Sequence, residues 1–196
     1  MARAGLNETR VLLEAELLID EIGLSNLTLA ALAQRLGVRQ PSLYKHVEGM
    51  EGLRRGLAVR AKVELANVLA RAAVGRGRGD AVRSIALAYR AWAREHPGRY
   101  AAAQRAPAPG DAEDGAASLA VVQVVTDVLA GYELHDADAI DATRAVRSAL
   151  HGFVVLESDG GFGLPVDIER SFERLLAGVL VALSAAAATA ASAHPA

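Results

Sequence analysis

Six of the eight residues from 39 to 46 carry side chains that form hydrogen bonds: Arg39, Gln40, Ser42, Tyr44, Lys45 and His46. Leu43 and Val47, four residues apart, provide the only apolar stripe in this segment. Such side chains read base edges in the major groove or contact phosphates. We predict base contacts from Arg39 and Gln40, and phosphate contacts from Tyr44 and His46. A short polar helix held by one apolar stripe suits insertion into DNA.

Two short helices joined by a tight turn, over residues 28–47, must position these side chains. The apolar face of the first helix recurs at helical spacing: Leu29, Leu32, Ala33 and Leu36. Gly37 ends this helix because glycine adopts the left-handed conformation with little strain. Pro41 suits the first turn of the second helix, where its missing N–H would be unpaired in any case. We expect the second helix to run from about Gln40 to Val47.

The same stretch resembles the helix-turn-helix of TetR-type transcriptional regulators. The matching residues are Thr28, Ala33, Gly37, Val38 and the run Leu43-Tyr44-Lys45-His46-Val47. The resemblance implies an all-α fold, with an N-terminal three-helix DNA-binding domain and a C-terminal helical domain for ligand binding and dimerisation. Together with the polar side chains of residues 39–46, it predicts a set of DNA-binding residues: Thr28, Arg39, Gln40, Pro41, Ser42, Tyr44, Lys45 and His46.

The motif departs from the family in two places. Val47 stands where a phenylalanine is usual, and the smaller apolar residue can still pack. Met50 stands where a lysine is usual, which removes a phosphate contact that Arg54 or Arg55 could replace. Trp92, with His96-Pro97 and His151-Gly152, further resembles a TetR-type subfamily whose C-terminal domain is known by its Trp, His and Gly residues.

Charge along the chain is uneven, although the net charge is only −2. Residues 35–62 hold seven Lys or Arg against two Glu, whereas residues 63–196 are net acidic. A basic patch on an acidic body is typical of a small DNA-binding head. There is no cysteine, which excludes disulfides and thiolate metal sites. No signal peptide is expected, and the uncharged run 175–193 is interpreted as a buried or interface helix, not a membrane span, so we expect a cytoplasmic protein.

The expected helices divide the chain into a DNA-binding domain, residues 7–62, and a C-terminal domain, residues 63–187. The first helix begins at the N-cap Asn7 and ends near Ile22, and a long helix over about 50–73 links the two domains. A Pro/Gly loop is expected over residues 105–115. Residues 188–196 are expected to be a disordered tail.

A small-molecule pocket is predicted from the scarce aromatic and polar residues of the aliphatic body: Tyr89, Trp92, Tyr100, Gln104, Gln123 and His151. The alternative is that each is an ordinary core residue with its polar tip satisfied. No two histidines share metal-ligand spacing, and Asp136, Asp138 and Asp141 are better explained by a helix start than by a metal. We therefore predict no metal, no cofactor and no enzyme activity.

Self-association is predicted through two apolar stripes near the C-terminus, which would form a four-helix bundle across a two-fold axis. The interface residues are Phe153, Leu156, Leu176, Val179, Leu180 and Leu183. The alternative is that both stripes face the core of their own subunit.

These observations predict a homodimeric repressor that binds double-stranded operator DNA and is released by a small, mostly apolar effector. Two alternatives remain open. The protein could activate transcription or act in both directions, or it could be a helical ligand-binding or enzymatic protein whose head no longer binds DNA.

Overall fold

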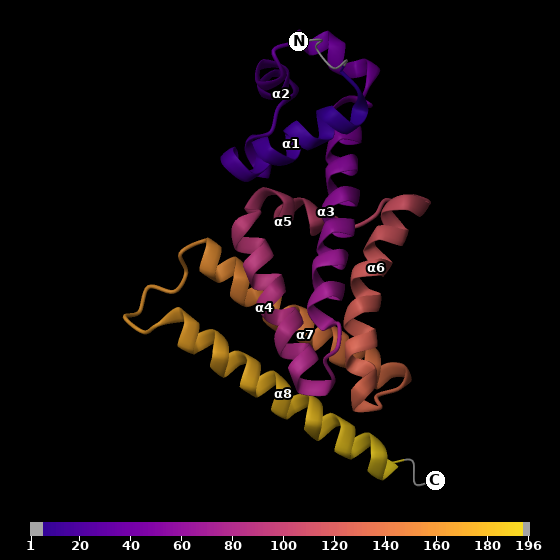
Figure 1. Cartoon of the computed structure of the whole chain (residues 1–196), viewed down its shortest axis with the longest axis vertical. Coiled ribbons are helices and arrows are strands. Elements are labelled where there is room, and N and C mark those ends of the chain that lie inside the picture. The colour runs from indigo at the N-terminus through magenta and orange to yellow at the C-terminus, as the bar shows by residue number, and fades with distance from the viewer. Residues whose placement is uncertain (1–5, 194–196) are drawn as a thin grey trace. The chain divides into compact units, whose positions relative to one another are not determined.

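A computed structural model describes residues 6–193, and every regular element in that range is a helix, which confirms the all-α fold (Figure 1). Contacts divide the chain into two compact units. The first unit holds residues up to 64 together with 95–118, and the second holds 65–94 together with the residues from 119 onward. The long helix α3, Gly49–Ala73, contributes to both, as does α6, Ala112–Leu129.

The first unit contains α1 (Glu8–Ile22), η1 (Leu24–Asn26), α2 (Leu29–Leu36), η2 (Gln40–Lys45) and α5 (Pro97–Ala103). Local signals determine the ends of its helices as expected. Asn7 caps α1 by accepting a hydrogen bond from the Arg10 N–H at 2.9 Å. Gly37 ends α2 in the left-handed conformation, with φ of 66°.

Helix α5 packs directly on the backbone of α1. A Cβ atom added at Gly98 would lie 2.1 Å from the carbonyl oxygen of Ile19, so only glycine permits this approach. Beside this contact, Asp20 accepts hydrogen bonds from the backbone N–H of Arg99 at 2.9 Å and from its guanidinium Nε at 2.7 Å. Residues 95–118 therefore join the head, whereas we predicted that everything beyond residue 62 would belong to a separate body.

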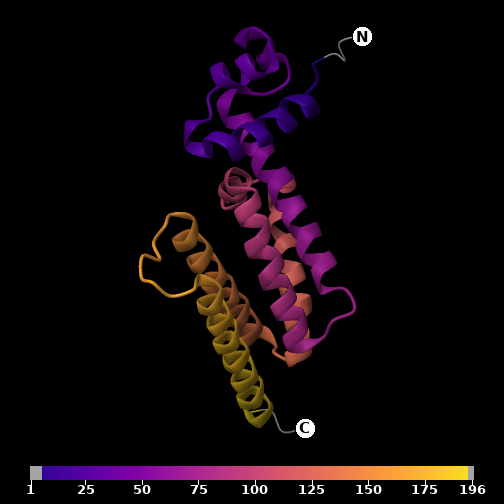
Figure 2. The same cartoon turned by 60° about the vertical axis from the view of Figure 1, so that its left-hand side comes forward.

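The second unit contains α4 (Arg78–Glu95), η3 (Ala130–Tyr132), α7 (Asp136–Ser158) and α8 (Ile168–Ala193). Figure 2 shows α8 returning alongside α7 after the loop that joins them. Arg90 of α4 is buried and fixes this pair. Its guanidinium donates to Glu157 at 2.7 Å and to Glu169 at 2.7 Å, and it lies over the ring of Phe172. The hydrogen bonds from Arg90 hold the pKa of Glu157 below its usual value.

Two helix boundaries differ from the sequence predictions. Helix α8 continues to Ala193, so residues 188–193 are helical and not a disordered tail, while residues 194–196 lie outside the described part. Four of the six residues 188–193 are alanine, which supports this extension because alanine has the highest helix propensity. Helix α6 begins at Ala112, inside the predicted loop, because Asp111 accepts a hydrogen bond from the Asp114 N–H at 3.1 Å.

Candidate nucleic-acid interface

The polar segment of the helix-turn-helix folds as one short 3-10 helix, η2, which begins at Gln40 as predicted and ends at Lys45, two residues before the predicted end at Val47. The Ser42 N–H donates to the Arg39 carbonyl oxygen at 2.9 Å, the i to i+3 pattern that short helices adopt. Leu43 is 0% exposed and Val47 is also buried, so the two apolar residues anchor η2 as predicted. This anchoring leaves the other side chains of η2 on the opposite face.

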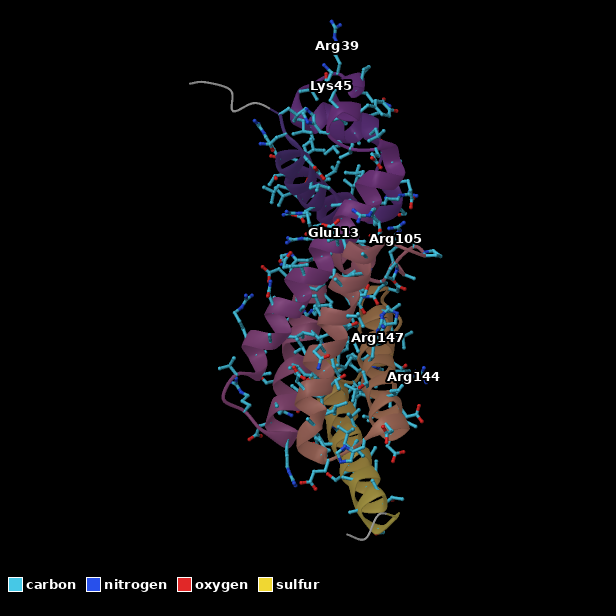
Figure 3. All side chains as sticks on the ribbon, turned by 90° about the vertical axis from the view of Figure 1, so that its right-hand side faces the viewer. Arg39, Lys45, Arg105, Glu113, Arg144 and Arg147 are labelled. Carbon is cyan, nitrogen blue, oxygen red and sulfur yellow. The ribbon has the colours of Figure 1, made fainter. Side chains whose placement is uncertain are left out.

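The side chains predicted to contact DNA lie on that opposite face. Arg39, Gln40, Pro41 and Lys45 are exposed, Tyr44 is 57% exposed, and Ser42 and His46 are partly exposed. Figure 3 shows Arg39 and Lys45 projecting away from the end of the first unit. Among residues 6–193, neither Arg39 nor Lys45 forms an ion pair. These side chains are therefore available to an external partner.

Thr28 precedes this surface in the chain and also stabilises the start of α2. Its hydroxyl oxygen caps α2 by accepting a hydrogen bond from the Ala31 N–H at 3.0 Å. Because the side chain is exposed, its hydroxyl hydrogen can still donate to a phosphate oxygen. Capping and DNA contact are thus compatible at this position.

Four of the seven basic residues counted between residues 35 and 62 are paired with acids of the same unit. Arg35 binds Glu14 and Glu21 of α1, and Arg60 binds Glu16 of the same helix. The hydrogen bonds from Arg35 lower the pKa of Glu21. These pairs hold α2 and α3 against α1 and stiffen the head, but they remove positive charge that DNA would otherwise meet.

Arg55 and Lys62 of α3 are paired with the start of α6. Arg55 donates to Asp111 at 2.6 and 2.7 Å and to Glu113 at 2.8 Å. The hydrogen bonds from Arg55 hold the pKa of Asp111 at about 2. Lys62 is buried against Asp114. Arg55 is therefore not available to bind the phosphate that Met50 cannot bind, whereas Arg54 is exposed and can do so.

Comparison with known proteins decides the family. Residues 82–179 match the Tetracyclin repressor-like, C-terminal domain family. The chain is 36% identical, over 91% of its own length and 95% of the relative, to an uncharacterized HTH-type transcriptional regulator, YobS, of Bacillus subtilis. The chain belongs to the TetR family. It is a DNA-binding transcriptional regulator and not an enzyme.

Other relatives agree with this assignment of the chain to the TetR family. An uncharacterized HTH-type transcriptional regulator of Mycobacterium tuberculosis, Rv0681, is 44% identical over 72% of this chain and 66% of its own length. The crystal structure of apo ActR from Streptomyces coelicolor has the same fold, with a TM-score of 0.70 and 21% identity, over 96% of this chain and all of that one. The additional resemblance to a Trp/His/Gly subfamily stays a prediction.

The six residues predicted to form a TetR-type effector pocket are distributed over both units. Tyr89 and Trp92 are buried on α4 in the second unit, whereas Tyr100 and Gln104 belong to the first. Gln123 is exposed and donates to Asp127 at 2.8 Å, one turn along α6. His151 is half-buried on α7. None of the six lines the groove or the cavity described below, so this set remains a prediction.

The predicted dimer residues divide into two groups. Phe153, Leu176 and Leu183 are buried within the single chain, as the alternative interpretation expected for them. Val179 and Leu180 are half-buried, and Leu156 is 50% exposed. A groove of about 680 Å³ lies between α7 and α8, and its lining includes Val179 and Leu183 of the predicted interface together with small residues outside the predicted set. Its floor is formed by small residues at helical spacing: Ala145, Ala149, Gly178, Ala182 and Ala186. That spacing was the available signal.

Proposed function

We propose that this TetR-family regulator represses transcription as a homodimer that binds operator DNA through η2. The proposal rests on the two faces of the η2 segment, one apolar and buried and the other polar and exposed. Leu43 and Val47 are buried, while Arg39 and Lys45 are exposed with no ion pair among the described residues. A polar surface kept free of internal partners supports docking to a major groove. Double-stranded DNA is therefore the proposed partner and the cytoplasm the proposed location.

The charge that would meet DNA is smaller than the sequence suggested. Arg39, Lys45 and Arg54 remain exposed without ion pairs, within the part of the chain that the structure describes. Each phosphate neutralised adds about −0.9 to the slope of log affinity against log salt, so six such cations in a dimer give a slope of about −5. Binding should therefore respond strongly to salt, and η2 must supply the sequence preference.

Dimerisation is proposed along the groove between α7 and α8. Small residues let two helix pairs approach closely. A two-fold axis across the groove would also place the charged residues of one copy opposite residues of the other sign in its partner. Arg174 lies near the start of α8, and Asp138 and Asp141 lie near the start of α7, so they mark opposite ends of the groove. The axis would bring Arg174 towards the partner's Asp138 and Asp141.

Helix α8 exposes much apolar surface, with Val181 70% exposed. By length and composition alone, two segments could cross a membrane, Ala112–Tyr132 and Ile168–Ser192, which is weak evidence. A TetR-family regulator can cover the surface of α8 by pairing with a second copy, and we therefore propose no membrane contact.

Replacing Ala182 by glutamate should dissociate the dimer, because each groove would bury an unpaired carboxylate. Sedimentation equilibrium at micromolar concentration should then give the monomer mass, and operator affinity should fall by at least about tenfold because bivalent binding is no longer possible. The matched control is Ala177→Glu, on the same helix but exposed and outside the groove, which should stay dimeric. A dimer that survives in A182E would place the interface elsewhere.

Repression is distinguished from activation by a reporter fused to the DNA upstream of the protein's own gene. We expect expression to fall when the wild-type protein is present and to recover with Lys45→Ala. A rise in expression with the wild-type protein would make it an activator. Release of the operator requires an effector that prefers the released conformation over the DNA-bound one.

A further inference from the structure

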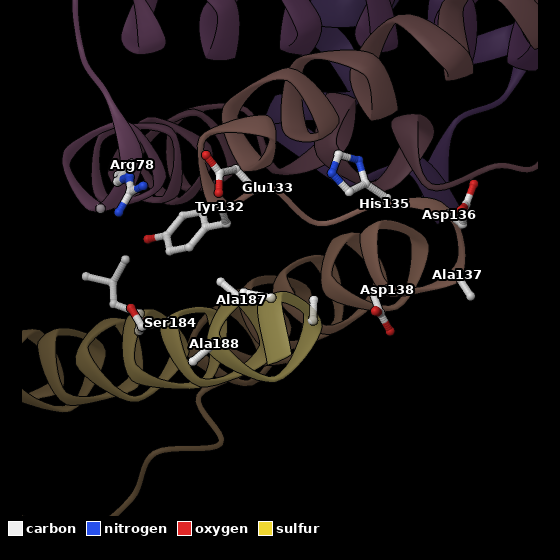
Figure 4. Close-up of a pocket in the computed structure, with 14 residues that line it drawn as sticks. Arg78, Tyr132, Glu133, His135, Asp136, Ala137, Asp138, Ser184, Ala187 and Ala188 are labelled. Atoms are coloured by element: carbon white, nitrogen blue, oxygen red, sulfur yellow. The ribbon is translucent and has the colours of Figure 1, made fainter. Parts of the chain in front are cut away.

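The second unit holds a cavity of about 990 Å³ that adjoins the groove between α7 and α8 at Asp138, which lines both (Figure 4). Three parts of the chain wall it: the start of α4, the segment from η3 to the start of α7, and the C-terminal half of α8. All of its lining residues belong to this one unit. Its size is within the range of small-molecule sites in proteins, which is about 300–1,000 Å³.

Tyr132 supplies the main polar group aimed into this cavity. Its side chain is 7% exposed, and Figure 4 shows the hydroxyl directed into the space between Arg78 and Ser184. Among residues 6–193 this hydroxyl forms no hydrogen bond. Burial raises the pKa of Tyr132, so the phenol stays protonated and can donate. The hydroxyl group is itself reachable from the cavity, and an occupant can accept its hydrogen bond.

The backbone around Tyr132 adopts uncommon conformations. Arg78, Glu133 and Asp136 have φ of 43°, 56° and 48°, and within residues 6–193 they are the non-glycine residues with positive φ. All three line this cavity. Left-handed conformations of this kind cost free energy and cluster at ligand sites. The strain therefore accompanies the cavity and not the helix-turn-helix.

Charge and polarity around the cavity restrict what it can bind. The lining carries three carboxylates, those of Glu133, Asp136 and Asp138, against one guanidinium, that of Arg78, beside the imidazole of His135, and this balance disfavours an anion. The positive charge of Arg78 lies close enough to oppose the pKa rise of Tyr132, and it disfavours an ammonium group at the hydroxyl. The wall formed by α8 is apolar apart from Ser184, with Leu180 and a row of alanines.

We propose that this cavity is a binding site for a mostly apolar small molecule with an uncharged hydrogen-bonding head, a hydroxyl or a carbonyl. The oxygen of the head accepts a hydrogen bond from the Tyr132 hydroxyl, and the apolar part lies against Leu180, Ala187 and Ala188. The site differs from the residues predicted from the sequence, and it can serve the proposed repressor as its effector site. Binding itself does not depend on that function.

The test is titration calorimetry on the full-length protein without DNA, using three probes that share one skeleton: 4-phenylbutanol, 4-phenylbutylamine and 4-phenylbutyrate. The alcohol should bind at least about fivefold more tightly than either charged probe. Tyr132→Phe should weaken binding of the alcohol about fivefold, the value of one neutral hydrogen bond. Ala187→Trp should weaken binding of the alcohol at least about tenfold, because the indole ring occupies the wall of α8 against which the apolar part is proposed to lie. Circular dichroism verifies that each variant is folded.

A matched tryptophan control is Leu119→Trp, at an exposed position of α6 in the second unit that lines neither the cavity nor the groove, which should bind the alcohol like the wild type. Equal binding of the alcohol by wild type and A187W would overturn the site. Tighter binding of the amine or the carboxylate would overturn the assigned head group. Because no DNA is present, either result leaves the proposed operator binding to be judged separately.

Discussion

Replacing Lys45 by alanine should weaken binding to operator and to unrelated DNA by the same factor, about tenfold or more at moderate salt. Lys45 is exposed on η2 and is not engaged in an ion pair within the described residues, so its charge is available to a phosphate. In a dimer the substitution removes two cations from the DNA-binding surface, and the slope of log affinity against log salt should become shallower by about 2. Fluorescence anisotropy over a salt series measures both quantities.

The matched control for Lys45→Ala is Arg147→Ala. Arg147 is also exposed, but it projects from α7 in the second unit (Figure 3). Its removal changes the net charge of the protein by the same amount without affecting a proposed phosphate contact. Affinity and salt slope should stay at the wild-type values. If both variants weaken binding equally, the effect comes from overall charge, and the proposed docking of η2 is wrong.

Replacing Gly98 by alanine should destabilise the head by about 2–4 kcal/mol, which is large for one added methyl group. The new Cβ would lie 2.1 Å from the Ile19 carbonyl oxygen and 2.7 Å from the Asp20 backbone nitrogen. Neither backbone atom can rotate away as a side chain could, so α5 must move off α1. That movement also separates Arg99 from Asp20. Urea unfolding followed by circular dichroism measures the decrease in stability.

Gly152→Ala is a control substitution that should raise the stability of the protein, whereas Gly98→Ala should lower it. Gly152 lies within α7, and a Cβ added there has no neighbour within 4 Å. Alanine has the higher helix propensity, so this variant should be more stable by about 0.5–1 kcal/mol. Equal effects of the two substitutions would contradict the close backbone contact described for Gly98.

Features that depend only on neighbouring residues, such as helix ends and buried apolar stripes, could be predicted from the sequence. Asn7 as the cap of α1, Gly37 at the end of α2 and the anchors Leu43 and Val47 all belong to this class. The side chains free to contact DNA followed from the same reasoning, since an amphipathic helix exposes the face opposite its apolar stripe. The motif and its exposed surface were therefore accessible without a structure.

Features that depend on partners far away in the sequence could not be predicted in this way. Arg55 pairs with acids that follow it by more than fifty residues, and nothing near Arg55 distinguishes it from the exposed Arg54. The same holds for Gly98, whose need for glycine comes from the backbone of α1. The cavity beside Tyr132 likewise combines three segments, so its polar and apolar walls are separated along the chain.

The central claim is that η2 docks this TetR-family regulator on DNA as a dimer. The most direct test is binding of the wild-type protein to the DNA that flanks its own gene, at about 50 mM and about 200 mM salt. We predict tight binding at low salt, two protomers per site, half-sites about 34–36 Å apart, and a salt slope near −5. Absence of binding at low salt, to this DNA and to random DNA alike, would contradict the claim.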